Sequence, residues 1–210
     1  MASGGVSCVV SVSDLELEGV FTASGSEGGV GAVVAPPHPL YGGLLTNPVV
    51  TAAASGFAQM GAATMAFNYR GTGASQGRAS DDAGSAVRDY TGALDALAER
   101  VPGPYVAAGY SFGSRAALAV AAADSRVLGA VLIAPPVDMV GREDFAAFTG
   151  PLLVIVGDRD AYAPLDRLRT ALAARPDARL EVVQGADHFF SASGTSAITA
   201  YLATHVAGWL

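Results

Sequence analysis

The chain has 210 residues, of which 51% are hydrophobic and 15% are charged, so it can bury a substantial core and is not expected to be disordered. Twelve basic residues against 19 acidic ones give a formal net charge of −7, and no basic run occurs, which argues against a nucleic-acid partner. The length predicts a single domain over residues 1–210.

The chain carries no sign of export or of a membrane anchor. Residues 1–12 lack a basic segment, and no apolar stretch free of turn residues approaches the roughly 18 residues of a membrane span. We therefore expect a cytoplasmic protein without membrane contact. The single cysteine, Cys8, is expected to pack as a small hydrophobic residue. Three scattered histidines do not suggest a metal site, and no cofactor is expected.

Apolar periodicity and turn residues predict strands that alternate with helices. The predicted strands are 6–12, 15–21, 30–35, 63–69, 105–110, 127–133, 152–156 and 180–183, with a polar loop at 24–29 and a glycine-rich loop at 70–77. The predicted helices begin at Pro48 after the cap Asn47, span the apolar positions 87 to 101, and cover 115–123, 165–174 and 198–209. This order predicts an α/β fold with a mostly parallel sheet, helices on both faces and an antiparallel hairpin at the start.

Gly109, Ser111 and Gly113 form a G-x-S-x-G motif between a predicted strand and a predicted helix. A serine on such a strand-to-helix turn is raised above the sheet, and the flanking glycines remove Cβ atoms from a tight turn. The first amides of the helix then face whatever binds there. The motif alone is also compatible with an ordinary turn, because the chain contains 26 glycines. Its flanks favour a nucleophile elbow.

A serine nucleophile needs a base, and the base needs an acid that orients it. Asp158 and Asp160 follow the strand at 152–156, and His188 follows the last predicted strand. These segments end at the carboxyl edge of a parallel sheet, where such proteins place their sites. The order Ser, Asp, His fits this architecture. The residues alone leave both aspartates open as the acid, with Asp138 as a more distant alternative.

Acyl transfer also needs donors for the negative charge that develops on the carbonyl oxygen. The amide of Phe112, directly after the serine, is one candidate. The other is expected in the loop that follows the strand at 30–35. Since Pro39 has no N–H, Leu40 is the first residue after His38 that can donate.

Several segments together resemble the α/β-hydrolase superfamily, and more closely the small lidless bacterial hydrolases related to dienelactone hydrolases. The segments are HPLYGG at 38–43 followed by Asn47, FNYRGTGAS at 67–75, GYSFG at 109–113 and GADHFF at 185–190. The likeness covers about residues 30 to 205. The sequence departs from that family's pattern at two places. Pro36-Pro37 precede His38, a difference that affects the expected oxyanion loop, and Ser114 stands where a further glycine is usual.

The resemblance implies an α/β-hydrolase fold with a minimal cap or none, and a triad of Ser111, Asp160 and His188. Asp160 is favoured because residues 157–164 match the family's G-x-x-D-x-x-x-P pattern. Only residues 134–151 occupy the place where lidded relatives insert a cap, which implies a shallow, open site. The apolar candidates around that site, any of which could equally be core, are Tyr41, Tyr162 and Phe189, with Leu40, Phe145, Phe148 and Phe190 beside them.

We therefore expect a carboxylesterase that acts on short-chain or compact esters through an acyl-enzyme, with oxyanion donors at Leu40 and Phe112. A serine nucleophile argues against true dienelactone hydrolase activity, whose family nucleophile is cysteine. Thioesterase, amidase and acyltransferase activities share the same triad and stay open, as does a ligand-binding protein without catalysis. We expect a small-molecule ester as partner and a monomer or homodimer.

Overall fold

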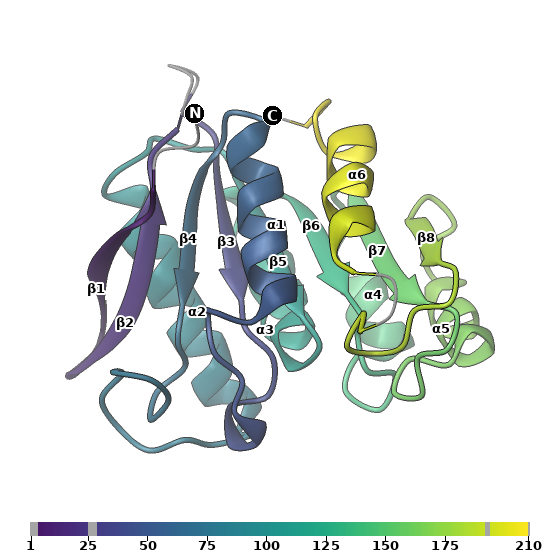
Figure 1. The fold of residues 1–210 in the computed structure, drawn as a ribbon, viewed down its shortest axis with the longest axis horizontal. Coiled ribbons are helices and arrows are strands. Elements are labelled where there is room, and N and C mark those ends of the chain that lie inside the picture. Colours follow the sequence, from purple (N-terminus) through teal and green to yellow (C-terminus); the bar gives the residue numbers. More distant parts are fainter. Residues whose placement is uncertain (1–3, 25–28, 192–193, 210) are drawn as a thin grey trace.

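The computed structural model describes residues 4–24, 29–191 and 194–209, and within them eight strands form one sheet (Figure 1). The strand order is β1-β2-β4-β3-β5-β6-β7-β8. The strands are β1 Val6–Val12, β2 Leu15–Thr22, β3 Gly31–Ala35, β4 Ala63–Phe67, β5 Tyr105–Tyr110, β6 Val127–Ile133, β7 Leu152–Gly157 and β8 Arg179–Val183. β1 and β2 pair antiparallel, β2 runs antiparallel to β4, and all later pairs are parallel.

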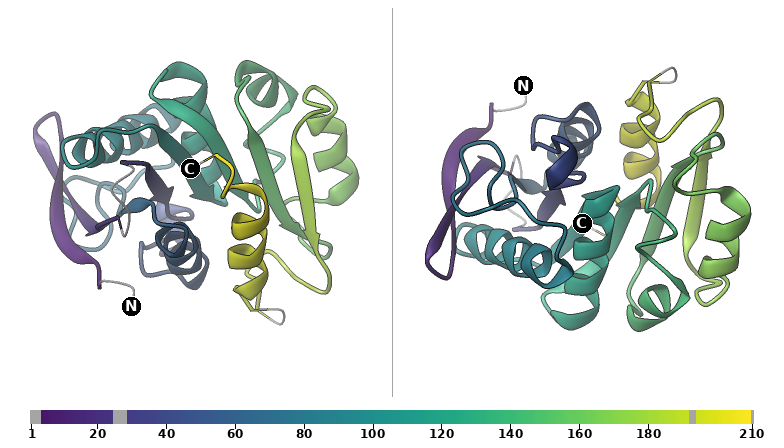
Figure 2. Two further views of the ribbon diagram at one scale, coloured as in Figure 1. Left: turned by 90° about the horizontal axis from the view of Figure 1, so that it is seen from above. Right: turned by 90° about the horizontal axis from the view of Figure 1, so that it is seen from below.

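Helices cover both faces of the sheet (Figure 2). α1 Pro48–Gln59 and α6 Ser196–His205 pack on one face. α2 Ala83–Ala98, α3 Phe112–Ala123, α4 Arg142–Ala147 and α5 Leu165–Leu172 pack on the other. The central strands β3 to β7 are buried along nearly their whole length, because both of their faces are covered. The predicted fold class is confirmed.

Helix boundaries differ from the prediction where local chemistry decides them. α3 begins at Phe112 rather than at residue 115, because the chain passes directly from the strand through Ser111 into the helix. α5 ends at Leu172, and the nearby Pro176 disfavours continuing it. α6 ends at His205, short of the predicted 209, with Gly208 in the turn that follows. Part of the predicted polar loop, residues 25–28, lies outside the described residues.

Two short elements were not predicted. A 3-10 turn, η1 Pro39–Tyr41, follows β3 and has His38 as its N-cap. The six-residue α4 lies within residues 134–151. Its Phe145 is fully buried in the core beneath the sheet, so this segment is a packed connection.

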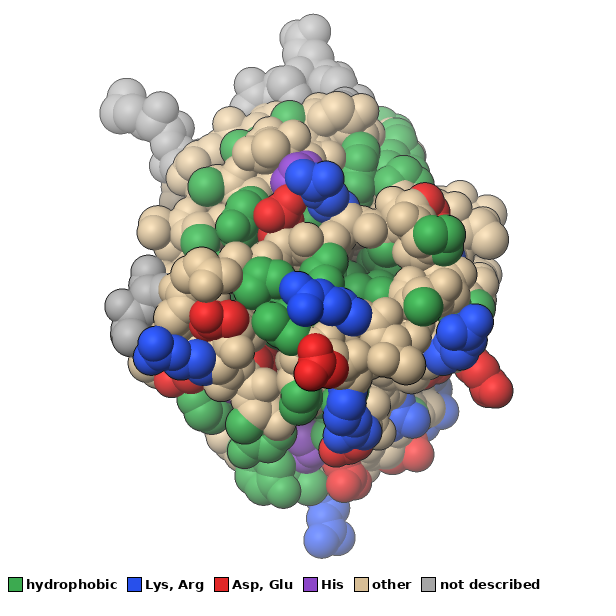
Figure 3. Space-filling view, turned by 90° about the vertical axis from the view of Figure 1, so that its right-hand side faces the viewer, with side chains coloured by type: hydrophobic (Ala, Val, Ile, Leu, Met, Phe, Trp, Pro, Cys, Tyr) green, Lys and Arg blue, Asp and Glu red, His purple; other side chains and the backbone are tan. Residues whose placement is uncertain are grey.

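Charge is dispersed on the face over β8 and α5. Acidic and basic side chains alternate there, with apolar side chains between them (Figure 3). In the described part of the chain, no helix is both long enough and apolar enough to cross a membrane.

The glycine-rich loop after β4 is anchored to α2 by a buried carboxylate. Asp89 is 1% exposed and accepts from the backbone amide of Arg70 at 3.0 Å and from its guanidinium Nη2 at 2.6 Å. The ion pair thus satisfies the carboxylate and fixes the start of the loop.

Asp89→Ala should lower the free energy of unfolding by about 3 kcal/mol, because it leaves the Arg70 guanidinium without its partner at a site that is mostly buried. Asp138→Ala is the matched control, since Asp138 pairs with Arg167 at 2.7 Å on the exposed surface. That variant should lose about 0.5 kcal/mol or less. Urea unfolding measures both, and equal losses would contradict the anchoring role of Asp89.

Candidate active site

Ser111 lies on a strained turn between β5 and α3. Its φ of 53° and ψ of −119° place a non-glycine residue in a region that costs about 1–3 kcal/mol. The Ser111 amide donates to the carbonyl of Ile133 on β6 at 2.8 Å, which holds the turn to the sheet. The predicted elbow geometry is present.

The two motif glycines are required by close backbone approach. A Cβ at Gly109 would lie 2.2 Å from the Gly113 carbonyl oxygen, and one at Gly113 would lie 2.6 Å from that of Pro36. Both neighbours are backbone atoms that cannot move aside. The absence of these two side chains therefore allows α3 to begin directly against β5 and the end of β3.

The structure brings Ser111, His188 and Asp160 together at the carboxyl edge of the sheet. His188 Nε2 lies 2.9 Å from Ser111 Oγ, and His188 Nδ1 lies 2.8 Å from Asp160 Oδ2. The three residues are between 4% and 8% exposed. This is a continuous hydrogen-bonded chain from a hydroxyl through an imidazole to a carboxylate.

Of the three candidate acids, only Asp160 meets the histidine. Its other oxygen, Oδ1, accepts from the amides of Tyr162 at 2.8 Å and Ala163 at 3.0 Å, so the carboxylate is held in one orientation. Asp158 turns the other way and accepts from the Gly185 amide at 2.7 Å. Asp138 lies on the surface with Arg167.

The loop that carries His188 is held by hydrogen bonds from Tyr110 and to Asp187. The buried hydroxyl of Tyr110, next to the serine, donates to the His188 carbonyl at 3.0 Å. Burial raises the pKa of Tyr110, so its hydroxyl stays a donor. Asp187 accepts from the amides of Phe189 and Ser191, bonds that lower the pKa of its carboxyl. This role of Tyr110 was not predicted from the sequence, although its position before the serine in G-x-S-x-G was the available signal.

The two expected oxyanion donors differ in their present bonding. Phe112 is the first residue of α3, and amides at this position have no intrahelical acceptor. The Leu40 amide donates to His38 Nδ1 at 3.3 Å, which is long for a hydrogen bond. Burial lowers the pKa of His38, which favours the neutral ring that this bond requires. The His38 ring also packs on the Phe112 ring at 4.8 Å.

A buried asparagine, which was not predicted from the sequence, supports the loop after β3. Asn68 is 3% exposed, accepts from the Leu45 amide at 2.7 Å and donates to Glu18 Oε2 at 2.7 Å. It thereby joins β2, the end of β4 and the loop after β3. The predicted strand 63–69 included Asn68, whereas β4 ends at Phe67, so the strand pattern did not indicate this role. Its place in the FNYRGTGAS segment was the available signal.

A cavity of about 360 Å³ opens beside Ser111. Its walls come from the loop after β3, the elbow, the 134–151 segment and the loops of the acid and the histidine: Pro37, His38, Tyr41, Gly42, Gly43, Asn47, Tyr110, Ser111, Pro136, Met139, Tyr162, His188 and Phe189. The three predicted contact residues Tyr41, Tyr162 and Phe189 are all among them.

Four other apolar candidates do not line this cavity. Phe145, Phe148 and Phe190 are at most 4% exposed, because each packs into the hydrophobic core rather than toward the serine. Leu40 is half-exposed on η1, outside the cavity wall. The sequence pattern could not separate these residues, since core and cavity aromatics have the same composition.

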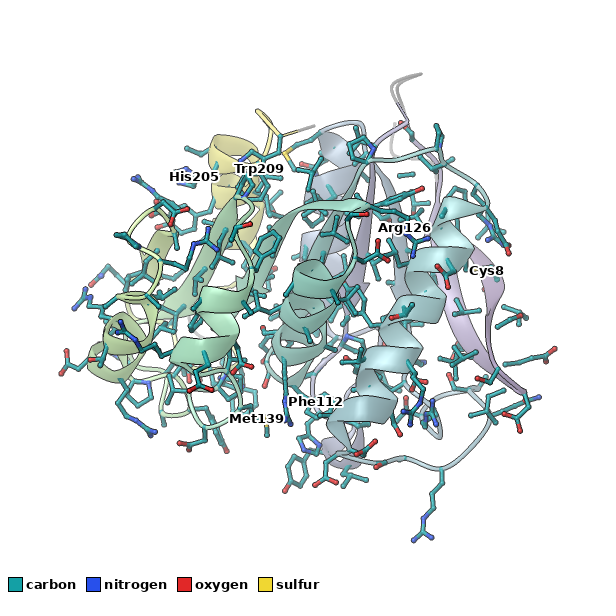
Figure 4. The ribbon with its side chains drawn as sticks, turned by 180° about the vertical axis from the view of Figure 1, so that it is seen from behind. Cys8, Phe112, Arg126, Met139, His205 and Trp209 are labelled. Atoms are coloured by element: carbon teal, nitrogen blue, oxygen red, sulfur yellow. The ribbon has the colours of Figure 1, made fainter. Side chains whose placement is uncertain are left out.

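Cys8 and His205 lie away from this edge. In Figure 4, Phe112 and Met139 lie at the lower end of the view, whereas Cys8 and His205 lie elsewhere on the molecule. Cys8 is half-buried against the sulfur of Met65, and His205 Nε2 lies 2.8 Å from Glu181 Oε1 on β8. Neither contributes to the site.

Comparisons with known proteins agree with this geometry. A family profile described as an alpha/beta hydrolase domain matches residues 42–207. An alpha-beta serine hydrolase homologue from Coxiella burnetii is 28% identical and has a TM-score of 0.86, covering 97% of this chain and 98% of that one. A serine hydrolase without a lid from Xanthomonas campestris is 26% identical, with a TM-score of 0.86 and coverage of 100% and 97%.

The likeness to dienelactone hydrolases extends to the fold. The enzyme from Anabaena variabilis superposes with a TM-score of 0.78 over 96% of this chain and 95% of its own, at 21% identity.

Gly109→Ala should destabilise the protein by at least about 2 kcal/mol, because the added methyl group meets the backbone of α3. Gly208→Ala is the control. Gly208 is exposed and does not have a positive φ, and a Cβ added there would meet no atom within 4 Å, so the unfolding free energy should change by about 0.5 kcal/mol or less. Denaturant midpoints compare the two, and a neutral Gly109→Ala would contradict the close-packed elbow.

Proposed function

The chain belongs to the α/β-hydrolase family, and we propose that within it the protein is a serine carboxylesterase that cleaves compact esters through an acyl-enzyme on Ser111. The observation that carries the proposal is the hydrogen-bonded chain of Ser111, His188 and Asp160 at the floor of an open cavity. It supplies a nucleophile, a base and an orienting acid in one place.

The reaction follows from these contacts. As Ser111 Oγ attacks the ester carbonyl, His188 Nε2 takes its proton, and Asp160 stabilises the resulting imidazolium. The carbonyl–alcohol bond then breaks, its electron pair goes to the alcohol oxygen, and His188 returns the proton to that oxygen. A water molecule, activated by the same histidine, hydrolyses the acyl-enzyme.

The oxyanion of the tetrahedral intermediate is assigned to the amides of Phe112 and Leu40. The Leu40 amide is held by a neutral imidazole nitrogen over a long bond. A charged oxygen is a stronger acceptor, so it can take this amide from His38.

The cavity sets the expected size of the substrate. About 360 Å³ beside the serine, together with a 134–151 segment that holds only the short α4, suits a small ester with room for its ends to reach solvent. All three members of the proposed triad are present, which favours catalysis over a purely ligand-binding role.

Ser111→Ala should lower ester hydrolysis by about 10⁴-fold or more, because the nucleophile is lost while the fold is kept. Hydrolysis of nitrophenyl esters of increasing acyl length measures the activity, and a thermal unfolding scan checks the fold. Intact-protein mass spectrometry should show one fluorophosphonate adduct on the wild type and none on the variant. Esterase rates that survive the substitution would overturn the assignment of Ser111.

Asp160→Asn should lower kcat by about 10⁴-fold, because an amide in this place can hold the imidazole in the wrong tautomer. Asp158→Asn is the matched control. Its amide oxygen can still accept from Gly185, and Asp158 does not touch His188, so this variant should keep most of its activity. If Asp158→Asn lowered kcat more than Asp160→Asn does, Asp158 rather than Asp160 would be the acid that orients His188.

A further inference from the structure

Exposed apolar side chains gather around the serine. Among the described residues, the large hydrophobic side chains that stand exposed are Leu40, Tyr41, Tyr162 and Phe189 near the site, and Val6 and Val9 on β1. Tyr162 is 57% exposed and Phe189 is 63% exposed, yet both line the cavity. Exposed aromatic rings beside a nucleophile indicate a surface for ligand contact.

These rings fall on two sides of the cavity. Tyr162 and Phe189 both contact the ring of His188, with centroid separations of 4.7 and 5.4 Å. Tyr41 instead contacts His38 at 4.5 Å, on the side of the oxyanion loop. His188 therefore has two exposed aromatic neighbours, in addition to the buried ring of Tyr110 at 5.7 Å.

Chemistry determines which part of an ester lies on the His188 side. When the acyl-enzyme forms, the departing alcohol oxygen receives its proton from His188 Nε2, so the alcohol must lie beside this imidazole. The rings that surround the imidazole on its exposed side are those of Tyr162 and Phe189.

We propose that Tyr162 and Phe189 form the binding site for the alcohol portion of the ester, and that this portion is uncharged and aromatic. The inference rests on the proposed esterase function and names the substrate class of the same site. Edge-to-face and offset contacts with two rings select a flat apolar group over a flexible polar one.

The backbone that carries both rings is held in place before a substrate arrives. The Tyr162 amide donates to Asp160 at 2.8 Å, and its carbonyl accepts from the Val137 amide at 3.1 Å. The Phe189 amide donates to Asp187 at 3.1 Å, and the next residue, Phe190, is buried in the core. Little backbone ordering therefore opposes binding on these rings.

The charges near the cavity disfavour an anionic alcohol. The described residues that line it include no lysine, arginine, aspartate or glutamate side chain. The Asp187 carboxylate next to the base is partly exposed, and amide bonds from the backbone lower its pKa, so it repels anions at neutral pH. A group such as the phosphorylated end of a coenzyme thioester finds no partner among these residues.

The test compares benzyl acetate with 2-methoxyethyl acetate, which share an acyl group and have alcohols of similar acidity. The wild type should prefer the benzyl ester in kcat/KM, and Phe189→Leu and Tyr162→Leu should each reduce that preference by about threefold to tenfold. Tyr162→Phe keeps the ring and should keep the preference. A preference that survives both leucine substitutions, or its absence in the wild type, would overturn the proposal.

The acyl side and the charge are tested separately. The ratio of kcat/KM for methyl phenylacetate to that for methyl acetate should not change in the leucine variants. If this ratio fell while the preference for the benzyl ester stayed unchanged, the rings would lie on the acyl side and the proposal would be overturned. The wild type should hydrolyse 4-carboxybenzyl acetate more slowly than benzyl acetate. Equal or faster hydrolysis would overturn the exclusion of anions.

A parallel measurement separates this proposal from the esterase function. Two methylphosphonates that differ only in their leaving group, phenol or fluoride, are reacted with Ser111. The labelling rate of the phenol compound is divided by that of the fluoride compound, and this ratio is compared between the wild type and Phe189→Leu. Labelling without any ester hydrolysis would reject the esterase function, while a lower ratio in the variant would still support the alcohol site. An unchanged ratio rejects the alcohol site, and no labelling of the wild type rejects both.

Discussion

The close contact between β5 and α3 is the constraint on which the rest of the site depends. Because Gly109 and Gly113 have no side chains, the helix starts immediately after the strand, and Ser111 is left at a positive φ on the turn. The same geometry places the Phe112 amide at the helix start, where it has no intrahelical partner. One backbone arrangement thus positions the hydroxyl and the amide that we propose as an oxyanion donor, and the surrounding sheet holds the strain.

The remaining groups come from loops that a parallel sheet brings to one edge. Asp160 follows β7 and His188 follows β8, so their distance from the serine is set by the spacing of strands. Each loop is then fixed by hydrogen bonds to buried groups, such as the Tyr110 hydroxyl on the histidine loop and Asn68 beneath the loop after β3. This support restricts the proposed catalytic groups to one geometry.

The residues proposed to carry out catalysis and those proposed to select the substrate differ in their burial. The hydrogen-bonded groups are nearly buried, whereas the rings of Tyr162 and Phe189 stand in solvent above them. In the proposed scheme the buried groups perform acyl transfer on any ester that reaches them, and the exposed rings discriminate between alcohols. Changes in those rings can alter substrate preference with little effect on the core, since neither ring packs into it.

The sequence alone determined the fold class and the order in which the candidate serine, acid and histidine follow successive strands. It also identified Ser111 and His188 as candidates, because hydrophobic periodicity and glycine spacing are local properties of the chain. It could not separate Asp158 from Asp160 without a family resemblance, since the two differ only in the direction of a turn that the tertiary structure sets. Likewise, Phe148 and Phe189 are alike in sequence. Only the tertiary structure separates them, because it depends on contacts between distant segments. Phe148 packs into the core, whereas Phe189 lies beside the imidazole of His188 and lines the site.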